Sequence, residues 1–314
     1  MNVIPRQFDF TDRKLQAILA DAEAHSVQCL GDYENEVIDL LSRGDELSGI
    51  KFPWGKTHGL VRLRYGEVSV WAGINGHRKS TLLNQVALWA TRECPVGICS
   101  LEMPVPSLAK LMVTQAAGAP KPTADWAKAL LKRIGNRMWF YDRLGSVPPI
   151  ELLGAVHALN NEGCRLMVID CLQMARVSDD MERERLFMSE LVSLAKALDV
   201  HVALVHHVRK PQSGGDEYVP SRFDVKGNGA IIDLAQNLFI CWANKARARV
   251  ERKVEHNMTL TDAEQKILDD EPDQKLIVAK QRHAEFEGPI HLWHHPSRQF
   301  TATNKREPLR LEVS

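Results

Sequence analysis

The sequence predicts an α/β fold in which helices cover a mainly parallel central sheet. From Glu67 onward, short apolar runs that are often rich in β-branched residues alternate with amphipathic stretches. This alternation is typical of parallel strands joined by helices. Two of the amphipathic stretches have clear helical spacing, at residues 81–91 and 184–198. The predicted strands lie at residues 68–71, 96–100, 138–141, 166–170, 202–205, 238–242 and 276–279.

The prediction divides the chain into two parts. Its 314 residues, 44% of them hydrophobic, suffice for one large α/β domain with an appendage or for two small domains. Apolar positions recur with helical spacing in the first 41 residues, and a stretch rich in Gly and charge follows. We expect residues 1–58 to form a helical linker segment and residues 59–314 to form the main domain. A charged helical insertion is expected at about 244–270.

Composition and charge narrow the class of protein. Lys+Arg and Asp+Glu both number 40, so any contact with an acidic polymer must come from a local patch. The six cysteines form no CxxC pair, which favours a reducing compartment. The first residues lack the apolar core of a signal peptide, and no run approaches the roughly 18 apolar residues of a membrane span. The sequence therefore predicts a soluble, cytoplasmic protein without a membrane partner.

The stretch AGINGHRKST at residues 72–81 fits the phosphate-loop pattern GxxxxGK[ST] at every position but one. It follows a predicted strand and precedes a predicted helix, where backbone N–H groups can point at phosphates. A lysine in this pattern reaches the β and γ oxygens of a nucleotide, and the following hydroxyl binds Mg²⁺. The predicted nucleotide-binding residues are Gly73, Ile74, Asn75, Gly76, His77, Arg78, Lys79, Ser80 and Thr81.

Arg78 stands where the pattern has its second glycine. Glycine there lets the backbone approach the phosphate without a Cβ, so a long side chain could distort the loop. The guanidinium could equally lie along the phosphates as an additional cation. A Gly-rich turn with two surface cations is the alternative to a nucleotide site. A second GK[ST] stretch, at Gly55, Lys56 and Thr57, lacks both the earlier glycine and a following helix, so we expect no nucleotide there.

Three other predicted strands end near polar side chains. Asp170 ends one strand, at the position where P-loop ATPases hold Mg²⁺ with a carboxylate. Glu102 follows a second strand and is a candidate general base, although a carboxylate before Pro104 is also common at the start of a helix. His207 follows a third. Because strand ends at one edge of an open α/β sheet form ligand sites, these residues predict binding of ATP, or another nucleoside triphosphate, with Mg²⁺.

The order of these motifs resembles the RecA-like ATPase domain of hexameric replicative DNA helicases of the DnaB, phage primase-helicase and Twinkle types. The resemblance covers residues 59–303 approximately, and it implies a RecA-like P-loop NTPase core. It also implies an ATP-hydrolysing ring, usually of six subunits, that moves 5′ to 3′ along single-stranded DNA during replication in a bacterium or phage-infected cell. It rests on the phosphate loop and on SLEM, VIDCLQM, VHHVRKP, DVKGNGAIIDLAQNLF and IVAKQRHAEFEGPIHL.

The resemblance implies a role for each residue of the predicted site. Lys79 would contact the β and γ phosphates, Glu102 would activate water, and His207 would sense the phosphate. Ser80 and Asp170 would hold Mg²⁺.

A further catalytic role falls on the segment AKQR near the end of the chain. Arg282, with Lys280 two residues before it, matches an arginine finger that reaches the nucleotide of a neighbouring subunit. Such a finger requires a homo-oligomer. A solvated cationic turn is the alternative for the same residues.

DNA contacts are implied for two loops that would line the channel of the ring. Backbone amides and a few cations per subunit suffice when six subunits follow one strand, so a neutral chain can still bind nucleic acid. Taken singly, each stretch is also compatible with an ordinary polar loop. The residues are Arg209, Lys210, Gly214 and Gly215 in the first loop and Lys226, Gly227, Asn228 and Gly229 in the second.

Two other functions are compatible with these motifs. Because of Arg78, a ring could bind nucleotide and DNA with weak or no hydrolysis and serve as a scaffold or loader. A RecA-type recombinase would share the core, but it would not be expected to carry AKQR at 279–282 or DVKGNGAI at 224–231. In the helicase interpretation, the N-terminal segment packs on an adjacent subunit, and a separate primase or loader serves as a partner.

Overall fold

A computed structural model describes residues 29–42, 48–175, 180–209, 217–227 and 229–312, which belong to two compact units. The first unit spans Met1–Glu46, and its described part contains the short 3-10 helix η1 (Leu30–Tyr33) and the helix α2 (Glu34–Ser42). Among the described side chains of α2, Val37, Ile38 and Leu41 are apolar and exposed. The earlier part of the predicted helical segment lies outside the described residues.

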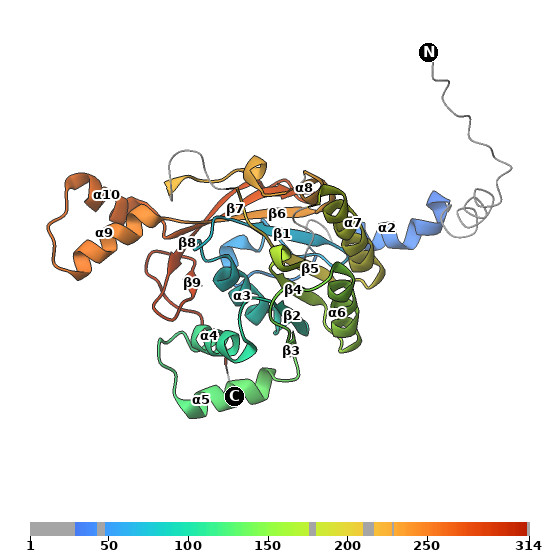
Figure 1. Cartoon of the computed structure of the whole chain (residues 1–314), viewed down its shortest axis with the longest axis horizontal. Coiled ribbons are helices and arrows are strands. Elements are labelled where there is room, and N and C mark those ends of the chain that lie inside the picture. Colours follow the sequence, from blue (N-terminus) through green and yellow to red (C-terminus); the bar gives the residue numbers. More distant parts are fainter. Residues whose placement is uncertain (1–28, 43–47, 176–179, 210–216, 228, 313–314) are drawn as a thin grey trace, which may run out of the picture. The chain divides into compact units, whose positions relative to one another are not determined.

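The second unit, Leu47–Ser314, is built on a nine-stranded sheet with the order β3-β2-β4-β5-β1-β6-β7-β8-β9 (Figure 1). All seven predicted strands are confirmed, with ends that differ by a few residues at most. The strands from β3 to β6 in this order pair in parallel, and β7 to β9 add antiparallel pairs. The strands are β1 (Val68–Ala72), β2 (Val96–Ser100), β3 (Met138–Tyr141), β4 (Leu166–Asp170), β5 (His201–Val205), β6 (Asn237–Ala243), β7 (Gln274–Gln281), β8 (Gly288–His294) and β9 (Phe300–Thr301).

Helices cover both faces of the sheet, which explains why the central strands are apolar along their whole length. Successive side chains of β1 point to opposite faces, so Val70 and Trp71 belong to two different hydrophobic clusters. One cluster contains side chains of α3 (Lys79–Ala90), α4 (Val105–Ala117) and α5 (Ala124–Ile134). The other contains side chains of α6 (Pro149–Asn161), α7 (Met181–Ala197) and α8 (Ala230–Leu234).

Residues 48–58, which the sequence prediction assigned to the linker segment, are part of the second unit. Ile50, Phe52 and Trp54 are almost completely buried, and the Phe52 ring lies 5.7 Å from that of Phe239. The Gly-rich, charged composition of this stretch obscured its alternating apolar residues, which are the pattern of an extended segment with one buried face. The second unit therefore begins twelve residues earlier than predicted, at Leu47.

Between β6 and β7 the chain forms two charged helices, α9 (Lys245–Glu255) and α10 (Asp262–Asp270), which contact each other. Both begin at residues whose side chains cap the helix, because Asn244 and Thr261 accept hydrogen bonds from backbone N–H groups of the first turn. The pair projects beyond one end of the β6–β7 hairpin (Figure 1). In the described part of the chain, no helix combines the length and the apolar character needed to cross a membrane.

Candidate functional site

A pocket of about 410 Å³ lies where β1, β2, β4 and β5 end. It gathers residues that the sequence predicted from four separate motifs. Ile74, Gly73 and His77 belong to the same loop without lining the pocket, whereas Gln173 and Val205 line it and were not predicted. The predicted residues that line it are Asn75, Gly76, Arg78, Lys79, Ser80, Thr81, Glu102, Asp170 and His207.

The loop after β1 is closed by its own lysine. Lys79 donates hydrogen bonds to the backbone oxygens of Gly73 (3.0 Å) and Ile74 (3.2 Å), and burial lowers the pKa of its ammonium group. A Cβ at position 73 would lie 2.5 Å from the backbone oxygen of Cys241, so only glycine fits this close approach to β6. The ammonium group of Lys79 therefore stabilises the loop, and the residue also lines the pocket.

Three hydrogen bonds connect the middle of this loop with the C-terminal end of β6, the start of β7 and the start of α9. The buried ring of His77 accepts a hydrogen bond at Nδ1 from the N–H of Ala243 (3.1 Å). The backbone oxygen of His77 accepts from Nε2 of Gln274 (3.2 Å), and that of Gly76 accepts from Nζ of Lys245 (3.0 Å). Because these anchors come from β6, β7 and α9, the tertiary structure sets the loop conformation. No signal in the sequence pointed to these contacts.

Arg78 has a left-handed backbone conformation, with φ 61° and ψ 27°. This is the conformation for which glycine is favoured, and an L-residue costs roughly 1–2 kcal/mol there. Glycine would adopt the same backbone conformation with less strain. The side chain of Arg78 forms no capping hydrogen bond with α3, and the first residues of that helix, Lys79, Ser80 and Thr81, line the pocket.

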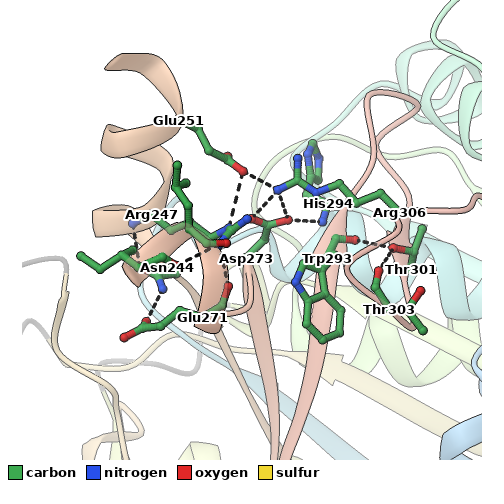
Figure 2. A network of polar contacts seen from close by, with 12 residues as sticks. Asn244, Arg247, Glu251, Glu271, Asp273, Trp293, His294, Thr301, Thr303 and Arg306 are labelled. Atoms are coloured by element: carbon green, nitrogen blue, oxygen red, sulfur yellow. Dashed lines mark hydrogen bonds and ion pairs between the residues drawn. The ribbon is translucent and has the colours of Figure 1, made fainter. Parts of the chain in front are cut away.

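A network of charged residues lies beside the loop, centred on the buried carboxylate of Asp273 (Figure 2). Asp273 accepts hydrogen bonds from Nε of Arg247 (2.7 Å), Nη2 of Arg306 (3.0 Å) and the N–H of His294 (2.6 Å). Glu251 on α9 also contacts Arg306 and Arg247. Although burial opposes it, the hydrogen bond to Glu251 and the charge of Asp273 raise the pKa of Arg306. The network thus joins α9, the start of β7, the end of β8 and the C-terminal segment.

The guanidinium of Arg78 lies within electrostatic reach of this network. Burial lowers the pKa of Arg78, while the charges of Asp273 and Glu251 raise it. Burial, with the charge of Arg78, lowers the pKa of His294 to about 4. Arg78 therefore stands between the pocket, which it lines, and the carboxylates of the network.

Asp170 and Ser80 lie in hydrogen-bonding contact on the pocket floor. Burial raises the pKa of Asp170 to about 6; the hydrogen bond from Ser80 opposes this shift, and the charge of Glu102 adds to it. A carboxylate and a hydroxyl are oxygen ligands of the kind that Mg²⁺ accepts. The pair therefore fits the predicted Mg²⁺ site.

Glu102 and His207 also line the pocket, and the buried Cys171 thiol contacts both of them. The Cys171 thiol donates a hydrogen bond to Oε1 of Glu102 (2.9 Å), and its sulfur lies 3.7 Å from Nε2 of His207. The other ring nitrogen of His207 lies 3.4 Å from Nζ of Lys79. Burial, with the charge of Lys79, lowers the pKa of His207 to about 4, so the ring is neutral at neutral pH. Cys171 was not predicted as a site residue, and its position directly after Asp170 was the available signal.

Lys280 and Arg282 do not line the pocket of their own chain. Lys280 pairs with Leu238 at the start of β6, the end of the sheet opposite to the pocket. Its ammonium group donates to backbone oxygens at the end of α8, including that of Ala235 (2.8 Å), and Arg282 donates to the backbone oxygen of Asp233. A contact of either residue with nucleotide therefore requires another subunit.

The described parts of the two predicted DNA loops lie side by side. Val208 and Val225 form an antiparallel bridge. The N–H of Arg209 donates to the backbone oxygen of Asp224 (2.7 Å), and the N–H of Lys226 donates to that of His207 (2.9 Å). Of the other predicted residues, Gly227 and Gly229 are described, whereas Lys210, Gly214, Gly215 and Asn228 lie outside the described residues.

Two features of this second loop were missed. Gly227 has φ 94°, and a Cβ there would lie 2.5 Å from the carboxylate of Glu184 on α7, so the position requires glycine. Phe223 is 77% exposed, and the Arg222 guanidinium lies 5.2 Å from the centre of its ring. An exposed aromatic ring beside cationic groups is a common surface for nucleic-acid bases.

The second GK[ST] stretch forms a short 3-10 helix, η2 (Gly55–Thr57). Lys56 donates to the backbone oxygens of His291 and Ala302, and Thr57 is buried. These contacts give the lysine a structural role, as expected for a stretch without a phosphate loop.

Comparisons with known proteins agree with this geometry. A model of the AAA domain family matches residues 58–213, and no curated protein sequence matches the chain. Among solved structures, one described as an ATPase domain has a TM-score of 0.70 and 15% sequence identity, covering 89% of this chain and 100% of that one. A structure of a DnaB-like replicative helicase and its interactions with primase has a TM-score of 0.64 and 16% identity, covering 91% of this chain and 70% of that one. Residues 58–213 are thus similar to the AAA domain family, and the chain has the α/β fold of RecA-like helicase ATPase domains.

Proposed function

We propose that the chain is the ATP-hydrolysing motor of a ring-shaped replicative DNA helicase that moves 5′ to 3′ along single-stranded DNA. The observation that carries this proposal is the single pocket in which four strand ends place a phosphate loop, an acid–hydroxyl pair, a carboxylate and a neutral histidine. Each of these groups supplies one requirement of phosphoryl transfer to water. The likeness to solved ATPase-domain and replicative helicase structures supports the same proposal at the level of the fold.

Each of these pocket residues would have its own role in the reaction. Lys79 would leave the carbonyls of Gly73 and Ile74 for the β and γ phosphates, while the N–H groups at the start of α3 bind the same oxygens. Ser80 and Asp170 would hold Mg²⁺, which neutralises charge on the phosphates. Glu102 would orient the attacking water and accept its proton.

The central test is ATP hydrolysis with and without single-stranded DNA. We expect the unmodified protein to hydrolyse ATP faster with DNA, and Lys79→Ala to reduce the rate by about 10²-fold or more, because the γ-phosphate loses its positioned cation. Arg78→Gly should keep the rate within a few-fold, because glycine accepts the left-handed conformation already present. If the unmodified protein is no faster than Lys79→Ala while Arg78→Gly hydrolyses ATP, the scaffold or loader function is correct instead.

We also infer that Mg–nucleotide binding weakens in acid because of Asp170. Its pKa of about 6 is raised by burial, so the carboxylate protonates and loses its metal-binding charge as the pH falls through this value. Affinity should be constant well above pH 6 and then fall by up to about tenfold per unit. Without metal, protonation of Asp170 has the opposite effect on the stability of the fold. Its raised pKa contributes stability at low pH that is lost as the pH rises through 6.

The measurement is a titration with a fluorescent ATP analogue and Mg²⁺ between pH 5 and 8. The matched control is Asp170→Asn, which cannot protonate and should show only the pH dependence of the nucleotide itself. If nucleotide affinity depends on pH in the same way in the two proteins, Asp170 is not part of the Mg²⁺ site.

For DNA binding, we propose that Arg209 and Lys226 contact phosphates and that Phe223 stacks on a base. Phe223→Ala should lower the affinity for single-stranded DNA by about 5- to 100-fold, as expected for one stacked base. Phe223→Tyr should retain binding. Ile150→Ala removes a side chain of similar exposure on α6 and serves as the control. Equal affinities of Phe223→Ala and Ile150→Ala would exclude the stacking role.

We propose that the chain works as a homo-oligomeric ring, usually of six subunits, in which Arg282 reaches the nucleotide of the next subunit. The exposed apolar side chains of α2, Val37, Ile38 and Leu41, would pack on a neighbouring subunit and link the ring. One of the similar solved structures is of a DnaB-like replicative helicase and its interactions with primase. We propose that a separate primase or loader is a partner of this chain.

A further inference from the structure

Three side chains with different metal-binding atoms meet beside the pocket, and two of them, Glu102 and His207, line it. Glu102 follows β2, Cys171 follows β4, and His207 lies two residues after β5. One ligand atom from each lies within 4.8 Å of the other two. In the described part of the chain, this is the one group of three or more His, Cys, Asp or Glu side chains with that property.

The combination of ligands suits a thiophilic divalent ion. Zn²⁺ binds thiolate at about 2.3 Å, imidazole at about 2.0–2.1 Å and carboxylate oxygen at similar distances, usually with tetrahedral geometry. These bond lengths place sulfur and nitrogen about 3.6 Å apart around one ion, and the Cys171 sulfur lies 3.7 Å from Nε2 of His207. The sulfur lies 2.9 Å from Oε1 of Glu102, so this oxygen would have to move outward by a fraction of an ångström. Glu102 is exposed and has room for that movement.

The neighbouring lysine constrains how the ion can bind. An ion at Nε2 of His207 requires the ring proton on Nδ1, which faces Nζ of Lys79 at 3.4 Å. Lys79 already donates at shorter distances to Gly73 (3.0 Å) and Ile74 (3.2 Å). The metal-bound form would therefore keep Lys79 on the loop carbonyls, away from the phosphate position.

We propose that Glu102, Cys171 and His207 form a site for Zn²⁺ or a similar thiophilic ion that inhibits nucleotide hydrolysis. The Cys171 thiol gives its proton to solvent as the sulfur–metal bond forms, and water from the pocket takes the fourth position. The ion removes Glu102 from contact with the attacking water and occupies His207. Mg²⁺ prefers oxygen ligands in octahedral geometry, so Ser80 and Asp170 remain a separate site. The inhibitory effect rests on the proposed ATPase function, whereas binding of the ion does not.

The binding test is a Co²⁺ titration of the full chain without nucleotide, because thiolate ligation to Co²⁺ gives a charge-transfer absorption that oxygen ligands do not give. We expect one equivalent per chain to produce this band, and Cys171→Ser to abolish it. Cys164→Ser is the matched control, since Cys164 is another buried thiol that lies just before the opposite end of the same strand, β4. His207→Asn should weaken binding at least tenfold and tests the site independently if Cys171→Ser does not fold. An absent band in the unmodified protein, or an equal band in Cys171→Ser, overturns the proposal.

The inhibition test adds Zn²⁺ to the ATPase assay at saturating Mg²⁺. Micromolar Zn²⁺ should inhibit the unmodified protein and Cys164→Ser, and a zinc chelator should reverse the effect. Whatever turnover Cys171→Ser retains should need at least tenfold more Zn²⁺ for half-inhibition. Loss of the Co²⁺ band with intact ATP hydrolysis would reject the metal site alone. A thiolate–Co²⁺ band in a protein that never hydrolyses ATP would reject the proposed function alone.

Discussion

We expect Glu102→Gln to lower the rate of ATP hydrolysis by about 10²–10⁴-fold while Mg–nucleotide affinity changes by only a few-fold. An amide cannot accept the proton of the attacking water, but it preserves the size of the side chain. Lys79, Ser80 and Asp170, which would bind the nucleotide and metal, are left in place. Phosphate release in the presence of single-stranded DNA gives the rate, and a fluorescent nucleotide gives the affinity.

The control is Glu162→Gln, which changes an exposed glutamate at the end of α6 and should leave both quantities unchanged. If Glu102→Gln weakens nucleotide binding as much as turnover, Glu102 is a binding residue instead of a base. Mixing Glu102→Gln with Arg282→Ala should restore part of the activity that each loses alone, because mixed rings contain sites with an intact Glu102 and an intact Arg282. Absence of restoration would place the arginine's effect within its own subunit.

Asp273→Ala should lower the free energy of unfolding by about 3–5 kcal/mol. Asp273 is 6% exposed and accepts hydrogen bonds from Arg247 and Arg306, so its removal leaves the buried Arg247 with only the more distant carboxylate of Glu251 (3.5 Å). The N–H of His294 also loses its acceptor. Because Arg78 lies within electrostatic reach of Asp273, the phosphate loop should loosen as well, with weaker nucleotide binding in the folded protein.

Urea unfolding followed by circular dichroism measures the stability of this variant. Lys128→Ala is the control, because its ion pair with Asp125 on α5 is exposed and should contribute less than about 1 kcal/mol. If Asp273→Ala loses no more unfolding free energy than the control, solvent replaces the contacts that the network makes.

Strands and the main site residues could be predicted because their signals are local. β1, β2 and β5 are buried on both faces, so their apolar runs stand out from the chain. Carboxyl ends of neighbouring parallel strands must share an edge of the sheet, which explains why Glu102 and Asp170 could be expected together. Residues 48–58 were misassigned because composition outweighed a short alternating pattern.

The contacts that shape the phosphate loop could not be predicted. His77 meets Ala243 and Gly76 meets Lys245 across more than 160 positions of the chain. Neither pair has a pattern in the sequence, since each exists only after β1 and β6 pair and α9 begins. The contacts of Cys171 with Glu102 and His207 were also not predicted, although the strand ends that carry these residues were expected to converge.

Arg78 changes what a phosphate-loop motif can be taken to mean. The three anchors on Gly76 and His77 are each worth about 0.5–1.5 kcal/mol, so together they can exceed the strain of a left-handed arginine. The requirement at this position is a backbone shape, and glycine is only the residue that meets it with the least strain. A search that demands glycine before the lysine would therefore overlook loops of this kind, whereas a search for the conformation would find them.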